Sequence, residues 1–197
     1  MSGNSKDWAF KDRVDICIAC CYTPSYYAKD DRGTIAKARE VLDRHNIGLS
    51  VWPEDNGGQK GGGNTLAHEM WKAPVLHDKE AYRKLRSDMY GLLYRTCRKP
   101  VAFVVFTNFD YSGYGIAPSL FTGVAPVVGE TPGCLIKPVG NDDQMDLLHE
   151  LIHCAGLSGH ADAKDRSNVM NEANGRSVMT REQGAALVRS AFSWTPG

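Results

Sequence analysis

Two histidines and a glutamate that lie close together in the chain could form a catalytic metal site. His149 and His153 are four residues apart, so on a helix their side chains share one face and can reach one metal ion. Glu150 then lies beside that metal, where a bound water molecule would sit. Gly156 lets the helix end and the chain turn back, and His160 follows within reach. This spacing predicts one catalytic zinc ion held by His149, His153 and His160, with a fourth position open for water.

The residues around these histidines are mostly apolar, unlike those around a chance pattern on a surface helix. They are Met145, Leu147, Leu148, Leu151, Ile152 and Ala155. Two imidazoles on a buried helix are costly unless a metal or a hydrogen-bond partner satisfies them. His68 and Glu69 lack such a pattern because Lys72 occupies the position of a second histidine. We expect only a solvated or capping pair there.

The stretch 149–170 resembles the metzincin clan of zinc endopeptidases. The signature of that clan runs His-Glu-x-x-His-x-x-Gly-x-x-His and is followed by a turn that places a methionine beneath the metal. Ser167–Asn171 matches the turn through Met170, and Met179 is a competing candidate. The resemblance implies a zinc peptidase with a mixed sheet ahead of the metal helix and a helix after the turn.

The chain departs from this signature at the third ligand. The clan places a histidine where this chain has Gly159, and His160 comes one residue later. We expect Gly159 to absorb the extra residue in a bulge, because glycine adopts conformations closed to other residues. The other candidates for the third ligand are Asp162, Glu172 and Glu182. The tyrosine that some metzincins carry two residues after the methionine is replaced by Glu172.

The predicted reaction is hydrolysis of a peptide bond with Glu150 as general base. Zinc would lower the pKa of its bound water toward about 7 and polarise the substrate carbonyl. We expect the substrate peptide to pair in extended form with an edge strand at 123–128. Tyr111 and Tyr114 would line the loop that borders the cleft. No inhibitory pro-segment with a zinc-blocking cysteine is evident, so a proteinaceous inhibitor is one possible partner.

Two other functions stay open at this stage. The same zinc site could serve an amidase that acts on cell-wall peptides. A non-catalytic protein could instead use zinc and the cleft only to bind a peptide. Glu150 argues against the second alternative, because a structural zinc site fills all four positions with protein ligands and needs no base.

The apolar patterns predict an α+β fold of zincin or metzincin type. Its mixed, mostly parallel sheet would have an antiparallel edge strand and a small C-terminal lobe ending in a helix. The predicted strands cover 14–21, 47–52, 101–106, 123–128 and 134–139. The predicted helices cover 34–45, 78–93, the metal helix up to Gly156, and 185–192. Their predicted caps are Thr34, Asp78, Asn141 or Asp142, and a capping box of Thr180 with Gln183.

The length of 197 residues favours one catalytic domain over 1–197, with an upper lobe at about 11–156 and a lower lobe at about 157–197. The chain has 23 basic and 23 acidic residues, so its charge indicates no nucleic-acid partner. No apolar run is long enough to span a membrane. The polar N-terminus lacks the apolar centre of a secretory signal, so we expect a cytoplasmic protein or export by a signal-independent route.

The six cysteines are expected to be mostly reduced core residues. Cys17 and Cys20 have the spacing of metal ligands but lack a second pair to complete a site. The glycine-rich stretch 56–64 is expected to be a loop. Its spacing does not match that of a phosphate-binding loop.

Overall fold

The computed structural model describes six segments of the chain: 8–22, 31–52, 100–106, 132–136, 144–171 and 175–195. Of the helix predicted at 78–93 it describes only scattered residues, all of them helical. Several predictions lie outside the described residues. These concern His68 and Glu69, Cys97, Tyr111, Tyr114, Glu172, the loop at 56–64 and the edge strand at 123–128.

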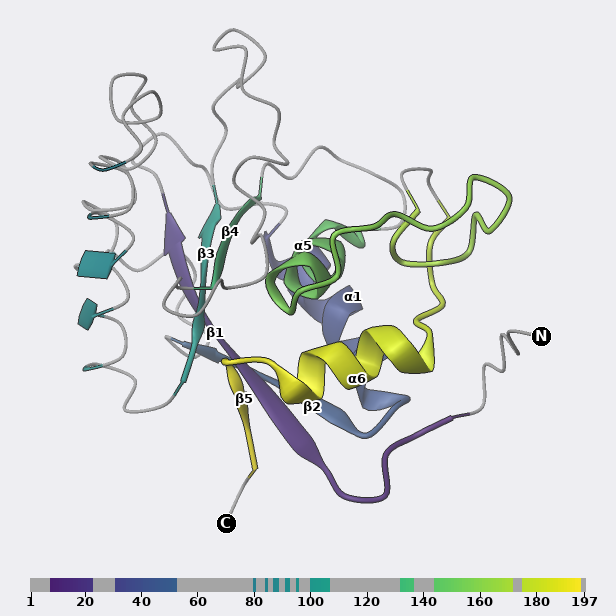
Figure 1. Cartoon of the computed structure of the whole chain (residues 1–197), viewed down its shortest axis with the longest axis horizontal. Helices are drawn as coiled ribbons and strands as arrows, with labels where there is room; N and C mark the ends of the chain where they lie inside the picture. The colour runs from purple at the N-terminus through teal and green to yellow at the C-terminus, as the bar shows by residue number, and fades with distance from the viewer. Residues whose placement is uncertain are drawn as a thin grey trace, which may run out of the picture.

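The described part of the chain is an α+β structure built on a mostly parallel five-stranded sheet (Figure 1). The strands are β1 (Val14–Tyr22), β2 (Ile47–Trp52), β3 (Ala102–Phe106), β4 (Gly133–Ile136) and β5 (Ser193–Trp194). The first four are parallel, in the order β2-β1-β3-β4. The antiparallel strand is the short β5, which pairs with Asp15 and Ile16 of β1. The strands before and after α1, which are β1 and β2, are parallel neighbours, in agreement with the mostly parallel sheet that the sequence predicts.

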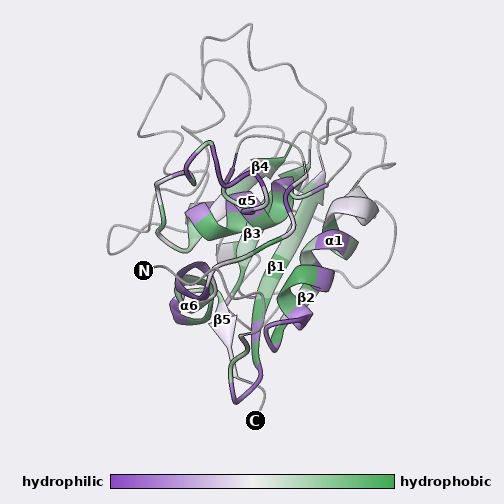
Figure 2. Cartoon of the chain, turned by 90° about the vertical axis from the view of Figure 1, so that its right-hand side faces the viewer, coloured by the Kyte–Doolittle hydropathy of each residue, from purple (hydrophilic) through white to green (hydrophobic). Residues whose placement is uncertain are grey.

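The two central strands are apolar because both of their faces are covered. Every residue of β3 is buried, and so are six consecutive residues of β1. Figure 2 shows the sheet as mainly hydrophobic. A parallel sheet covered on both faces requires such continuous apolar runs, and these runs are what made the strands predictable.

Three helices are described in full and lie on one face of the sheet (Figure 1): α1 (Asp31–Asp43), α5 (Asp146–Cys154) and α6 (Arg181–Arg189). The helix α5 packs on β4 and also contacts α1 and α6. Leu147, Leu148, Leu151 and Ile152 of α5 are fully buried in the shared core. No helix among the described residues is long and apolar enough to cross a membrane.

The predicted caps of the first helix and of the metal helix are wrong. Thr34 lies inside α1 rather than at its start. The helix α5 begins at Asp146 with Met145 as its N-cap, so neither Asn141 nor Asp142 caps it. Thr34 performs that task from another element: its hydroxyl donates to the carbonyl of Gln144 at 2.9 Å and accepts from the amide of Leu147 at 3.2 Å. A side chain of α1 therefore fixes the start of the metal helix.

The capping box at the C-terminal helix is confirmed, although the helix occupies earlier residues than predicted. The Thr180 hydroxyl accepts from the amide of Gln183, and the Gln183 side chain accepts from the amide of Thr180. The helix then covers Arg181–Arg189 instead of 185–192. The backbone carbonyl of Phe192 accepts from the amide of Cys17 at 3.0 Å, so the chain returns to the sheet as β5.

The described cysteines are buried and form no disulfide, as predicted. They are Cys17, Cys20, Cys21, Cys134 and Cys154. Within the described segments, Cys17 and Cys20 belong to no group of three or more residues that could hold a metal ion. These thiols therefore act as core residues.

Replacing Thr34 with valine should destabilise the protein. The buried amide of Leu147 would lose its acceptor, which typically costs about 1–3 kcal/mol. Urea denaturation of Thr34→Val and Thr34→Ser would measure the difference, because serine keeps the hydroxyl and removes only a methyl group. If the valine variant were at least as stable as the serine variant, the capping role of Thr34 would be wrong.

Candidate metal centre

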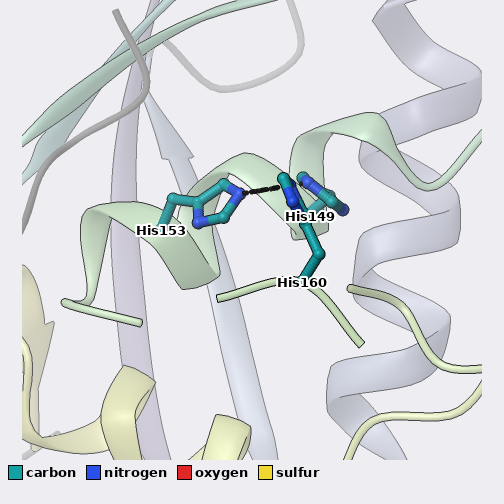
Figure 3. Close-up of side chains that lie close together, drawn as sticks. All are labelled: His149, His153 and His160. Atoms are coloured by element: carbon teal, nitrogen blue, oxygen red, sulfur yellow. Dashed lines mark hydrogen bonds between the residues drawn. The ribbon is translucent and has the colours of Figure 1, made fainter. Parts of the chain in front are cut away.

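The three histidines of the predicted site come together in the structure. Figure 3 shows the imidazoles of His149 and His153 on α5 and that of His160 on the segment after it. The Nε2 atom of His153 lies 3.1 Å from Nε2 of His149 and 3.3 Å from Nε2 of His160. One ring nitrogen from each residue lies within 4.8 Å of the other two.

Backbone hydrogen bonds determine which ring nitrogen of His149 and of His153 is available to a metal ion. His153 Nδ1 lies 2.6 Å from the carbonyl oxygen of Leu157, and His149 Nδ1 lies 3.0 Å from that of Val169. A carbonyl oxygen can only accept, so each Nδ1 must carry the hydrogen that it donates. In the neutral ring, Nε2 is then an unprotonated acceptor. Bonds of this kind orient metal-binding histidines in many proteins.

The arrangement of the three Nε2 atoms fits a bound cation. Unprotonated nitrogens about 3 Å apart present lone pairs to one another, which is favourable only with a proton or a cation between them. Ligand nitrogens about 2.0–2.1 Å from a tetrahedral zinc ion lie about 3.3 Å apart. The spacings around His153 agree with that value. The three histidines could therefore hold a metal ion.

Burial favours the neutral, metal-binding form of two rings. It lowers the pKa of His149 from its usual value to about 4, and the hydrogen bond to Val169 opposes this only in part. Burial likewise lowers the pKa of His153. Both imidazoles are thus available as neutral ligands at neutral pH.

The turn after α5 positions His153, as the glycine in the motif predicts. Gly156 has a φ of 104°, in the left-handed region that favours glycine. Its amide donates to the carbonyl of His153 at 2.9 Å, and the amide of Leu157 donates to that of Ile152 at 3.3 Å. These two bonds form a Schellman motif. The same turn directs the carbonyl of Leu157 toward the His153 ring.

The third histidine reaches the cluster through the exposed segment that contains Gly159. His160 is exposed and follows Gly159, which does not adopt a left-handed conformation. A Cβ atom at Gly159 would meet nothing within 4 Å. The extra residue is therefore accommodated in open, exposed chain.

The described alternatives to His160 lie outside the metal-binding group. The carboxylate of Asp162 accepts from the amide of Lys164 at 2.9 Å, which is a local turn interaction. Glu182 is exposed in the first turn of α6. Among the described residues, the group consists of His149, His153 and His160 alone.

The turn that contains Met170 lies against the metal helix. It includes Val169, whose carbonyl accepts from His149, while Met170 itself is buried. The carbonyl of Met170 accepts from the amide of Ala161 at 3.0 Å, so the turn also holds the segment next to His160. Met179 is equally buried, but its carbonyl accepts from the indole of Trp8 instead. These contacts favour Met170 over Met179 as the methionine of the turn.

Glu150 has a buried carboxylate oxygen, Oε2, with no hydrogen-bond partner among the described residues. Burial raises the pKa of this carboxyl well above its usual value, and Cys154 and Asp146 raise it further. The positive charge of Arg176 opposes the rise. A buried carboxylate oxygen without a partner is uncommon in folded proteins, which makes Glu150 a candidate functional residue.

A partly buried ion pair near Glu150 was not predicted. Arg176 is almost fully buried, and its guanidinium donates to Asp146 Oδ1 at 2.8 Å. Asp146 lies one helical turn before Glu150, so the pair connects the segment after the Met170 turn to the start of α5. The sequence shows an acidic residue, Asp146, in the first turn of the metal helix. Its partner Arg176 could not be identified because it lies 30 residues away in the chain.

The chain was compared with models of known protein families and with curated proteins, and neither comparison gives a match. Its function must therefore be inferred from the site itself.

Two glycines of the motif provide a matched test of the site. Gly156→Ala should weaken metal binding by about tenfold or more, because alanine disfavours the left-handed turn that orients His153 through Leu157. Gly159→Ala should bind metal like the wild type, since its Cβ has space. Competition with a chromophoric chelator measures both affinities. Equal affinities in the two variants would contradict this account of the turn.

Proposed function

We propose that this protein is a zinc-dependent metalloendopeptidase of the metzincin kind. Its zinc ligands are His149, His153 and His160, and Glu150 is its general base. One observation carries the proposal: the Nε2 atoms of three histidines converge, and two of these rings are oriented by backbone hydrogen bonds. The helix that carries those two rings also carries Glu150, whose Oε2 is buried without a partner among the described residues.

The order of the elements supports the metzincin-like fold. A mostly parallel sheet precedes the metal helix α5, and a left-handed glycine ends that helix. A methionine-containing turn then packs against a metal ligand, and the helix α6 follows. The single catalytic domain proposed from the length of the chain agrees with this order.

Zinc is the metal that we propose for this donor set, which suits transition metals. Neutral imidazole nitrogens suit zinc, whereas magnesium and calcium prefer oxygen ligands. When bound to three histidines, zinc lowers the pKa of a water molecule to about 7 and polarises a carbonyl group. The segment at Ser158 and Gly159 is exposed, so the ligand side of the site has access to solvent.

The role proposed for Glu150 is proton transfer. Its carboxylate accepts a proton from the attacking water as the new carbon–oxygen bond forms. It then gives that proton to the amine that leaves when the carbon–nitrogen bond breaks. A carboxyl whose pKa is raised by burial holds a proton well enough to act as the acid in the second step.

The proposed substrate is a peptide in extended conformation. A parallel sheet exposes backbone donors and acceptors at its edge, and an extended peptide can pair with them. In the described strand order β4 stands at one end of the sheet, and β4 is also the strand on which α5 packs. A peptide bound along that side of the sheet would pass close to the metal helix.

Glu150→Gln should keep its zinc and lose nearly all peptide cleavage, by at least about 100-fold, because the amide cannot accept the proton. The matched control is Glu182→Gln, the same change at an exposed glutamate outside the metal-binding group. Each zinc-loaded protein is incubated with a diverse peptide mixture, and new peptide ends are identified by mass spectrometry.

New ends from the wild type and Glu182→Gln, but not from Glu150→Gln, would establish the peptidase and outline its specificity. Cleavage by Glu150→Gln at the wild-type rate would contradict the role of Glu150. If zinc were bound and no variant cleaved any peptide, a binding function or a narrower amide substrate would replace the peptidase.

A further inference from the structure

The buried side-chain amide of Gln183 connects the start of α6 to the turn beside the metal-binding histidines. Gln183 is the third residue of α6, and its Oε1 accepts from the amide of Thr180 at 2.8 Å as part of the capping box. The other end of the same side chain, Nε2, donates to Asn168 Oδ1 at 2.8 Å. Both side chains are buried.

Asn168 connects Gln183 to the turn that contains Met170. Its Oδ1 also accepts from the amide of Met170 at 2.9 Å, and its Nδ2 donates to Asp165 Oδ2 at 3.3 Å. The contact with the Asp165 carboxylate requires the amide nitrogen on that side. The orientation of the Asn168 side chain therefore follows from its three partners.

The peptide held in this way is the one that orients a metal ligand. Val169 follows Asn168, and its carbonyl accepts from His149 Nδ1 at 3.0 Å. The amide of Val169 donates to the carbonyl of Val178 at 2.8 Å. The Val169 carbonyl and the Met170 amide form one peptide group, which the Asn168 side chain holds through that amide. Val178 holds the preceding peptide group, so a shift of either one would turn the His149 ring.

We propose that Gln183 is a positioning residue of the metal site, which acts through Asn168 and the Val169 carbonyl on His149. The inference rests on metal binding by the three histidines, as in the proposed function. The residue type supports it: a capping box accepts glutamate or glutamine, and glutamate interacts better with the helix dipole. Only glutamine has the donor that Asn168 requires.

The test is Gln183→Glu, which keeps the capping acceptor and removes the donor. We expect the zinc affinity of the full-length chain to fall about tenfold, the lower end of the effect of losing a group that bonds directly to a metal-binding histidine. A flipped Asn168 cannot restore the contact, because Met170 would lose its acceptor and Oδ1 would face the Asp165 carboxylate. Zinc affinity is measured by chelator competition, alongside urea denaturation of the metal-free protein.

Two controls separate positioning from helix stability and from charge. Thr180→Ala removes the other half of the capping box but leaves the contact between Gln183 and Asn168. It should lower stability and leave zinc affinity unchanged. The double variant that combines Glu182→Gln with Gln183→Glu has the net charge of the wild type. It should bind zinc as weakly as the single variant Gln183→Glu.

Wild-type zinc affinity in Gln183→Glu would overturn the inference, and so would an equal loss of affinity in Thr180→Ala. A wild-type protein that binds no zinc would overturn both this inference and the peptidase. If the wild type bound zinc and cleaved no peptide, weaker zinc binding by Gln183→Glu would support the positioning role while contradicting the peptidase.

Discussion

The candidate site depends on two hydrogen bonds from imidazole Nδ1 atoms to backbone carbonyls. They assign the hydrogen of each neutral ring to Nδ1 and leave Nε2 of His149 and His153 as acceptors 3.1 Å apart. Neither carbonyl belongs to a regular element: Leu157 lies in the turn after α5, and Val169 lies in the turn of Met170. The metal helix supplies the two rings at the correct spacing, but the two turns decide where the rings point.

Burial is the second constraint, and it gives the site its electrostatic character. The Arg176–Asp146 pair largely neutralises its own charges, whereas Oε2 of Glu150 is buried without a partner among the described residues. Burial disfavours the ionised carboxylate, and a nearby cation favours it. In the proposed function, the positive charge of a metal among the Nε2 atoms would favour the charged carboxylate that Glu150 needs as a general base.

Local patterns in the sequence predicted the parts of this fold that a few neighbouring residues encode. The apolar runs of β1 and β3, the histidine spacing on α5, the left-handed Gly156 and the capping box of α6 are all of this kind. The contacts that tie these parts together could not be found in this way. Thr34 precedes an apolar helical pattern and so resembles a cap of its own helix, yet it bonds to Leu147, 113 residues away. Tertiary packing decides such pairings, and one sequence does not reveal it.

The displaced third histidine shows that motif spacing predicts the position of a metal ligand less well than the hydrogen bonds that fix the neighbouring residues. His160 lies between two residues that are fixed by backbone hydrogen bonds: Leu157 by the Schellman motif and Ala161 by the carbonyl of Met170. Ser158 and Gly159 in between are exposed, and the space around Gly159 is open. One residue more or less in that interval changes the path of exposed chain without disturbing the packed core. The position of Nε2 is then determined by its anchored neighbours, so a signature with one extra residue can still bring the third imidazole to the other two.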